Sequence, residues 1–155
     1  MPATKFVPEV PHARLQFEDL KVRESELLPG DGYADYVKPF RTVEDIHVQA
    51  AVLAYLMREG QRLSWPQNWL ERLSALLAAL GKIADMPASH AETHIALAGA
   101  LAIGAGLIGE TEAFWEKTAD PAADRWQRDK ELLKVAGSAR EQRTKRAWEA
   151  LRQDG

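Results

Sequence analysis

The fold is decided by residues 90–110, which read HAETHIALAGALAIGAGLIGE. Residues 95–108 form a run of fourteen uncharged side chains, and glycines stand at positions 99, 104, 106 and 109. Each glycine costs a helix about 1 kcal/mol relative to alanine, so a helix here needs close neighbours. A membrane-spanning helix needs about 20 apolar residues, so we expect no membrane partner. The stretch predicts the packed central helix of a helical bundle.

Small residues four apart indicate how this helix meets its neighbours. Ala98, Ala102 and Gly106 would form one groove along it. A helix that is apolar nearly all round is buried on most sides. A single chain of 155 residues offers few elements to cover it. We therefore expect helix 95–108, or its neighbour, to lie at an interface between identical subunits.

Helix-start signals divide the remaining chain into helical stretches. Four are capping boxes or close variants of one, and one is an N-cap followed by proline. They are Thr42 with Asp45, Ser64 with Gln67, Ser89 with Glu92, Ser138 with Glu141, and Asp120 with Pro121. Gly60 and Gly81 predict helix ends, and a break is expected at Gly137. Short loops make consecutive helices antiparallel, so the sequence predicts an all-α four-helix bundle over residues 42–155.

The first 41 residues have a different character and predict an extended arm. Residues 1–12 contain three prolines. Residues 13–22 alternate apolar and polar side chains, with one slip of register, which favours a short β-strand. Pro29, Gly30 and Gly32 then predict a turn that leads into the bundle.

Composition limits the classes of function. The chain has no cysteine, which excludes disulfides, thiolate metal sites and cysteine nucleophiles. The N-terminus lacks the apolar core of a signal peptide, and we expect a cytoplasmic protein. Residues 121–155 carry nine Lys or Arg and six Asp or Glu within a chain of net charge −3. This basic tail is too weakly charged to predict a nucleic-acid partner.

The histidine pair His90 and His94 raises the question of a metal site. Zinc metalloproteases have glutamate directly after the first histidine, whereas Glu92 follows His90 by two residues. Glu92 therefore points to another side of the helix. The other histidines, His12 and His47, are distant in sequence. We expect no bound metal and interpret the two histidines as a surface pair.

Three further groups of residues have both a structural and a functional interpretation. The five tryptophans are expected in the core rather than in a ligand cage; they are Trp65, Trp69, Trp115, Trp126 and Trp148. A basic patch is expected to be a solvated face, with a phosphate-bearing ligand as the alternative; it comprises Arg140, Arg143, Lys145 and Arg146. Glu44 and Asp45, near Arg41 and His47, stabilise a helix start, with a carboxylate base as the alternative.

The segment ARLQFEDLKVRESELLPGDGY, residues 13–33, resembles the end of the middle β-domain of acyl-CoA dehydrogenases. There a strand leads through a glycine turn into a C-terminal helical domain. The residues that match the strand are Phe17, Asp19, Leu20 and Val22, and those that match the turn are Leu28, Gly30 and Gly32. Arg23 replaces the usual proline. The resemblance covers residues 13–152.

This resemblance implies a four-helix bundle that drives oligomer formation and contributes to flavin and acyl-chain sites. In one branch of the family, a glutamate on the first helix abstracts the α-proton of the acyl-CoA. Glu44, twelve residues after Gly32, falls about one residue from that place. The Y-E-G-T motif of the other branch and the R-x-x-F-G stretch that contacts flavin have no counterpart here. The resemblance, which begins at residue 13, does not extend to the N-terminal helical domain or to most of the middle domain.

These features lead to three expectations about function. The first is an acyl-CoA dehydrogenase-like helical protein that self-associates, has no complete flavin site and is not catalytic alone. The second is a subunit that completes a split flavin-dependent acyl-CoA dehydrogenase, with Glu44 as the base and FAD held by a flavoprotein partner chain. The third is a helical adaptor, or a protein that binds an apolar ligand between its helices.

Overall fold

The protein is described by a computed structural model over residues 6–10, 13–134 and 137–153. Every regular element in these residues is helical and no strand is present, so the all-α class is confirmed. The elements are η1 (Glu24–Glu26), η2 (Gly32–Val37), α1 (Lys38–Arg62), α2 (Gln67–Ala84), α3 (Ala91–Glu110), α4 (Glu112–Trp115), α5 (Pro121–Asp129), η3 (Lys130–Lys134) and α6 (Gly137–Gln153).

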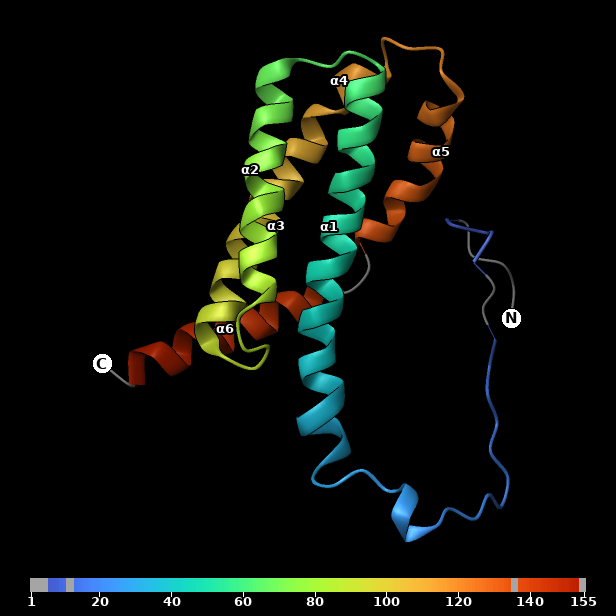
Figure 1. Cartoon of the computed structure of the whole chain (residues 1–155), viewed down its shortest axis with the longest axis vertical. Coiled ribbons are helices and arrows are strands. Elements are labelled where there is room, and N and C mark those ends of the chain that lie inside the picture. The colour runs from blue at the N-terminus through green and yellow to red at the C-terminus, as the bar shows by residue number, and fades with distance from the viewer. Residues whose placement is uncertain (1–5, 11–12, 135–136, 154–155) are drawn as a thin grey trace.

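Helices α1, α2 and α3 run antiparallel to one another in chain order and form the centre of the fold (Figure 1). Helix α2 packs against both α1 and α3. Helix α5 lies beside α1, and α6 packs against α3 near its start, with the first turns of α1 extending beyond α6 (Figure 1). The fourth predicted stretch is thus two helices with different directions, and the restart expected at Gly137 is confirmed. The finer prediction of a four-helix bundle is not confirmed.

The core has an aliphatic part and an aromatic part. Leucines from all three long helices are buried in it; they are Leu53, Leu56, Leu73, Leu76, Leu80, Leu97 and Leu107. The aromatic part contains Trp65, Trp69, Trp115 and Trp126, which are all buried. The core position predicted for these four tryptophans is confirmed. It is wrong for Trp148, which is 47% exposed on α6.

The expected strand at residues 13–22 does not form. The segment has no regular structure, bends at Glu18 and Asp19, and has no backbone partner among the described residues; its apolar side chains are exposed. A strand is stabilised by hydrogen bonds to a neighbouring strand, and the described residues offer none. Figure 1 shows the arm standing away from the helices before it returns to α1. The turn at residues 29–32 does form, with Gly30 at φ +83°.

Helix α1 begins earlier than expected, at Lys38 rather than Thr42. Pro39 lies in its first turn, where a missing N–H costs nothing, and the helical turns of η2 lead directly into it. Thr42 is therefore an interior residue with 1% of its surface exposed, and its predicted capping role is wrong. Gly60 does not end the helix either, since α1 continues to Arg62. The missing side chain of Gly60 instead makes room for Trp65 and Leu70.

The glycine-rich stretch is helical, as predicted, but it is buried on one side only. Leu97, Ala100, Gly104 and Leu107 face the core. A Cβ atom on Gly104 would stand 2.5 Å from Nε2 of Gln49, so this glycine allows α1 to approach. The predicted groove of small residues lies mainly on the opposite, exposed side. The described residues thus do not bury this helix on most sides, contrary to what the sequence indicated.

The same helix has the length and composition of a membrane span when it is taken together with α4. Within residues Ala91–Trp115, an 18-residue stretch has a mean hydropathy of 1.5, which is apolar enough for a membrane span. The core helix of a soluble protein can have this composition too. Only 28% of that stretch is buried, because α3 contacts the core with one side and its opposite side is a continuous uncharged surface.

Helix α5 is attached to the end of α1 by Asp120. One carboxylate oxygen of Asp120 accepts a hydrogen bond from the backbone N–H of Ala122 at 2.9 Å, which confirms the predicted N-cap. The other accepts one from Nη1 of Arg62 at 2.7 Å. Arg62 also donates to the buried carboxylate of Glu59. Hydrogen bonds from Arg62 and Ala122 lower the pKa of Asp120 to about 2.

Replacing Asp120 with asparagine should reduce the loss of folding stability at acidic pH. The pKa of Asp120 is about 2 in the folded protein against an ordinary value of 3.8, so its charge stabilises the fold above about pH 4. That contribution disappears as the pH falls towards about 2. Asparagine keeps the cap but has no charge to lose. Thermal unfolding over this range should therefore show a smaller acid-induced loss in Asp120→Asn, and parallel curves would contradict the assignment.

Candidate functional site

A hollow of about 550 Å³ lies near the starts of α1 and α3, where α6 crosses them. Helices α1 and α3 run in the same direction because α2 connects them, so their N-termini share one end of the fold. The lining includes Lys38, Arg41 and Glu44 from α1 and His94 from α3. The side chains contributed by α6 are mainly arginines: Arg140, Arg143 and Arg146.

Asp45 joins α1 to α6 at the inner wall of this hollow. Its Oδ1 accepts hydrogen bonds from Nε and Nη2 of Arg140 at 2.9 and 2.7 Å. Its Oδ2 lies 2.8 Å from Nη2 of Arg143. Asp45 is only 8% exposed, so the guanidinium groups are held in place by a nearly buried carboxylate. Asp45 is thus a structural partner of α6, not a solvated residue of a first helical turn.

His94 forms the back of the hollow and connects three segments. Its Nε2 lies 2.9 Å from the carbonyl oxygen of Ala88 and 3.3 Å from Oγ1 of Thr42. Since a carbonyl only accepts, the ring proton is on Nε2. Burial lowers the pKa of His94, the bond to Ala88 opposes the shift, and the charges of Arg143 and Lys38 add to it. His94 is therefore a neutral, positioned side chain at neutral pH.

Positive charge exceeds negative charge around the hollow. Its lining contains five cationic side chains but only two carboxylates, those of Glu44 and Asp45. Asp45 is already paired with two arginines. Within the described part of the chain, Lys38, Arg41 and Arg146 form no ion pair. The hollow is consequently a place where an anion would be stabilised.

Glu44 is exposed at the rim of this hollow, one residue before the buried Asp45. The fold thus brings the predicted base close to the predicted basic patch, although the two are far apart in sequence. A carboxylate here can accept a proton from a bound molecule or orient a cationic group. Oxidation of a thioester would additionally need a hydride acceptor, such as a flavin held by another chain.

Other predicted residues lie outside the site. Lys145 pairs loosely with Glu149, and His47 bonds to the carbonyl of Val43. His90 is exposed at the start of α3, and His12 lies outside the described residues. Among the residues that are described, no three acidic or histidine side chains are placed to hold a metal.

Sequence reasoning missed the roles of Lys38, Thr42 and Asp45. A signal for Asp45 existed, because it precedes the buried Ile46 and lies three residues after Thr42 on one side of α1. Polar residues with this spacing on an apolar helix side indicate a buried partner elsewhere in the chain. Nothing in the local sequence identifies that partner as α6.

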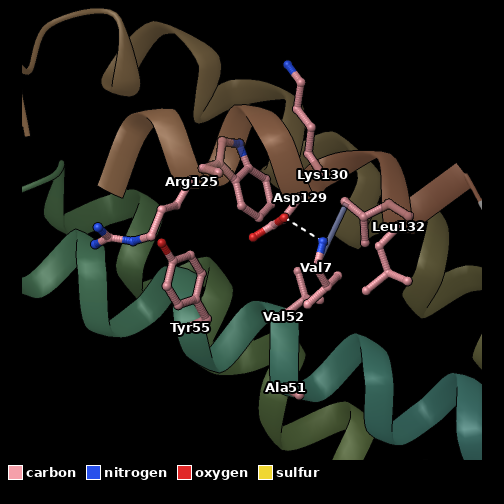
Figure 2. A pocket seen from close by; sticks show the side chains of 10 residues that line it. Val7, Ala51, Val52, Tyr55, Arg125, Asp129, Lys130 and Leu132 are labelled. Carbon is pink, nitrogen blue, oxygen red and sulfur yellow. Dashed lines mark hydrogen bonds between the residues drawn. The ribbon is translucent and has the colours of Figure 1, made fainter. Parts of the chain in front are cut away.

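A second, apolar hollow of about 310 Å³ lies between α1 and the α5–η3 segment. Figure 2 shows Tyr55 and Val52 on one side and Leu132 on the other, with Val7 reaching in from the N-terminal segment. The backbone N–H of Val7 donates to Oδ1 of Asp129 at 2.8 Å. The hollow offers apolar surface but few groups that would orient a ligand.

Neither a protein-family model, nor a characterised protein, nor a solved structure matches the chain.

Proposed function

We propose that this chain is a self-associating helical protein, similar to the C-terminal domain of acyl-CoA dehydrogenases, without a complete flavin site of its own. Two copies would meet through the exposed side of α3, within a bundle that becomes complete only in the assembly. The protein would act in the cytoplasm and would not be catalytic alone. FAD would be bound only together with a partner chain.

The observation that carries this proposal is the set of exposed glycines on α3. A Cβ atom added to Gly99, Gly106 or Gly109 would meet no atom within 4 Å. Each glycine costs the helix about 1 kcal/mol relative to alanine, and no contact within the described chain requires its small size. Close approach of another helix would require it. By contrast, Gly104 and Gly60 already have neighbours within the fold.

A second copy of this chain is the occupant that this surface favours. The outer side of α3 combines Ala102, Gly106 and the 60% exposed Ile103, and it carries no charge between residues 95 and 109. A two-fold pairing places an uncharged stripe against itself with no unpaired charge. The surrounding surface is charged, as the ion pair of Arg72 with Glu110 illustrates at the far end of α3.

The resemblance supports the remainder of the proposal. Residues 13–33 have the order of features that precedes the helical domain in that family, and an all-helical region follows them here. The flavin-contacting R-x-x-F-G stretch is missing from the sequence. A helical domain with these features would contribute to assembly while the redox cofactor belongs to another chain.

Substituting glutamate for Gly106 should convert the assembly to single chains of 17.3 kDa. The substitution places a charge in the centre of the proposed contact, where pairing would strip it of water. The helix itself should tolerate the change, because glutamate is the better helix former and the position is open. Light scattering coupled to gel filtration measures the mass of the wild-type and variant proteins.

Gly81→Glu provides the matched control, because Gly81 also lies in a helix with open space around it, on α2. The control should keep the mass of the wild-type assembly. A wild-type protein that is already a single chain at high concentration would refute self-association. Purified protein with stoichiometric flavin absorbance would refute the cofactor part, and partition into detergent micelles through α3 would favour a membrane instead.

A second candidate is the complementing subunit of a split dehydrogenase, and the arm favours it. Four apolar side chains along the extended segment are more than half exposed: Leu15, Phe17, Leu20 and Val22. An unpaired extended segment with this alternation is suited to add a strand to the sheet of another protein. Flavin bands that appear only when a partner flavoprotein co-purifies would select this candidate, and Glu44 would then be tested as its base.

A further inference from the structure

We propose that the hollow between α1, α3 and α6 binds the phosphate group of a small organic phosphate. This inference does not depend on self-association or on any flavin. It rests on the charges that surround the hollow, on the way Asp45 fixes two of them, and on the volume of the hollow.

First, the lining of the hollow has more cationic than anionic side chains. Lys38, Arg41 and Arg146 line the hollow and form no ion pair within the described residues. Like charges gathered around one cavity repel each other, and a bound dianion removes that repulsion. The excess comes from α1 and α6, which are far apart in the sequence, so it is a product of the fold.

The second argument is the orientation of the arginines. Asp45 engages Nε and Nη2 of Arg140 and Nη2 of Arg143, and the Nη1 groups of both arginines have no partner among the described residues. Nε of Arg143 is buried, so a ligand would meet the Nη groups. Arginine N–H groups held in a fixed plane suit phosphate oxygens in particular.

The third argument is the start of α3. Ala91 lines the hollow, and His90 at the N-cap position gives no side-chain hydrogen bond to the first turn. The free N–H groups of a helix start favour an anion. This feature adds to the arginines, which make the main contribution.

The volume indicates the kind of molecule. A hollow of about 550 Å³ falls in the range of small-molecule sites and exceeds what one phosphate fills. Tyr33 lies at its edge with 67% of its surface exposed, where its ring can cover an organic group. The ligand is therefore an organic phosphate, with the phosphate at the arginines and its body towards Tyr33.

Titration calorimetry with inorganic pyrophosphate and with ADP, at fixed physiological ionic strength, tests the proposal on the full chain. Both should bind once per chain, and ADP should bind at least as tightly because it carries an organic body. The double variant Arg41→Gln with Arg146→Gln should weaken both by about tenfold or more, since each lost charge-assisted contact reduces affinity. Neither arginine has a described ion pair, so the fold should persist.

The matched control is Lys145→Gln with Arg152→Gln, which removes the same charge from α6 outside the hollow. It should change affinity less than twofold, and equal weakening in both double variants would overturn the site in favour of general charge attraction. Equal competition by an acidic peptide without phosphate would overturn the phosphate assignment. The Gly106→Glu protein should bind as the wild type does, so failure of self-association and failure of this site are separable.

Discussion

Replacing Trp69 with alanine should lower the free energy of unfolding by about 3–5 kcal/mol. The Trp69 side chain is fully buried, and its indole N–H donates to the carbonyl oxygen of Leu107 at 3.0 Å. Its ring lies edge-on to Trp65 at 5.3 Å and to Phe114 at 5.9 Å. Alanine would leave a large cavity and an unpaired carbonyl where α2 meets α3. Domains of this size are stable by about 5–15 kcal/mol, so much of the margin would be lost.

Urea unfolding followed by circular dichroism measures this change. Trp148→Ala is the matched control, because Trp148 is about half exposed on α6 and should cost less than about 1 kcal/mol. The two variants make the same chemical change at two levels of burial. Equal losses would mean that the aromatic part of the core does not stabilise the fold as described.

The sequence predicted best where helix signals and apolar periodicity agreed. The Asp120 cap at the start of α5 was found in this way. Helices α2 and α3 form where they were expected, but Ser64 and Ser89 do not cap them: the N-caps are Pro66 and His90, without a side-chain hydrogen bond, and α2 continues past Gly81 to Ala84. These features depend on residues within one or two turns of each other. The start of α6 at Gly137 was also predicted from local sequence, because a glycine and a capping signal occur together there.

The strand at residues 13–22 failed for a reason that lies outside its own sequence. Alternation of Leu15, Phe17 and Val22 makes a strand possible, but a strand exists only beside another one. Residues 6–10, 13–134 and 137–153 contain no such partner. The alternating segment therefore lacks a neighbouring strand. In the second candidate function, the sheet of another chain would supply that strand.

The inner side of α1 was mispredicted because its partner is distant in sequence. Thr42 and Asp45 were predicted in a capping box at the start of this helix. Thr42, Asp45 and Gln49 are buried instead. A polar residue can be buried when a partner satisfies it, and Thr42 and Asp45 find theirs on α3 and α6. Single-sequence periodicity contains no information about such long-range pairs.

The candidate site was predicted only in pieces. Glu44 and the arginines of α6 were each identified, but as separate features with separate interpretations. Their convergence depends on the position of α6, which packs against α3 and is joined to α1 by the ion pairs of Asp45 with Arg140 and Arg143. The energy of this contact is consequently the main test of the site's architecture.

Replacing Asp45 with alanine should destabilise the protein by about 2–4 kcal/mol, because it leaves two mostly buried guanidinium groups without their carboxylate. The Asp45 side chain is 11% exposed, and those of Arg140 and Arg143 are 24% and 16% exposed. Helix α6 buries only Ala147 among its described residues, so apolar contacts alone hold it weakly. Amide hydrogen exchange should therefore accelerate first in residues 137–153, before the core opens.

Glu44→Ala is the matched control, because it removes the neighbouring carboxylate, which is exposed and has no ion pair within the described residues; it should leave α6 protected. A double-mutant cycle gives the sharper test. If the ion pairs hold α6, then removing Arg140 and Arg143 should cost much less in the Asp45→Ala background than in the wild type. Additive losses would mean that the three residues act separately and that another contact fixes α6. The hollow would then lose its structural basis together with the phosphate site proposed for it.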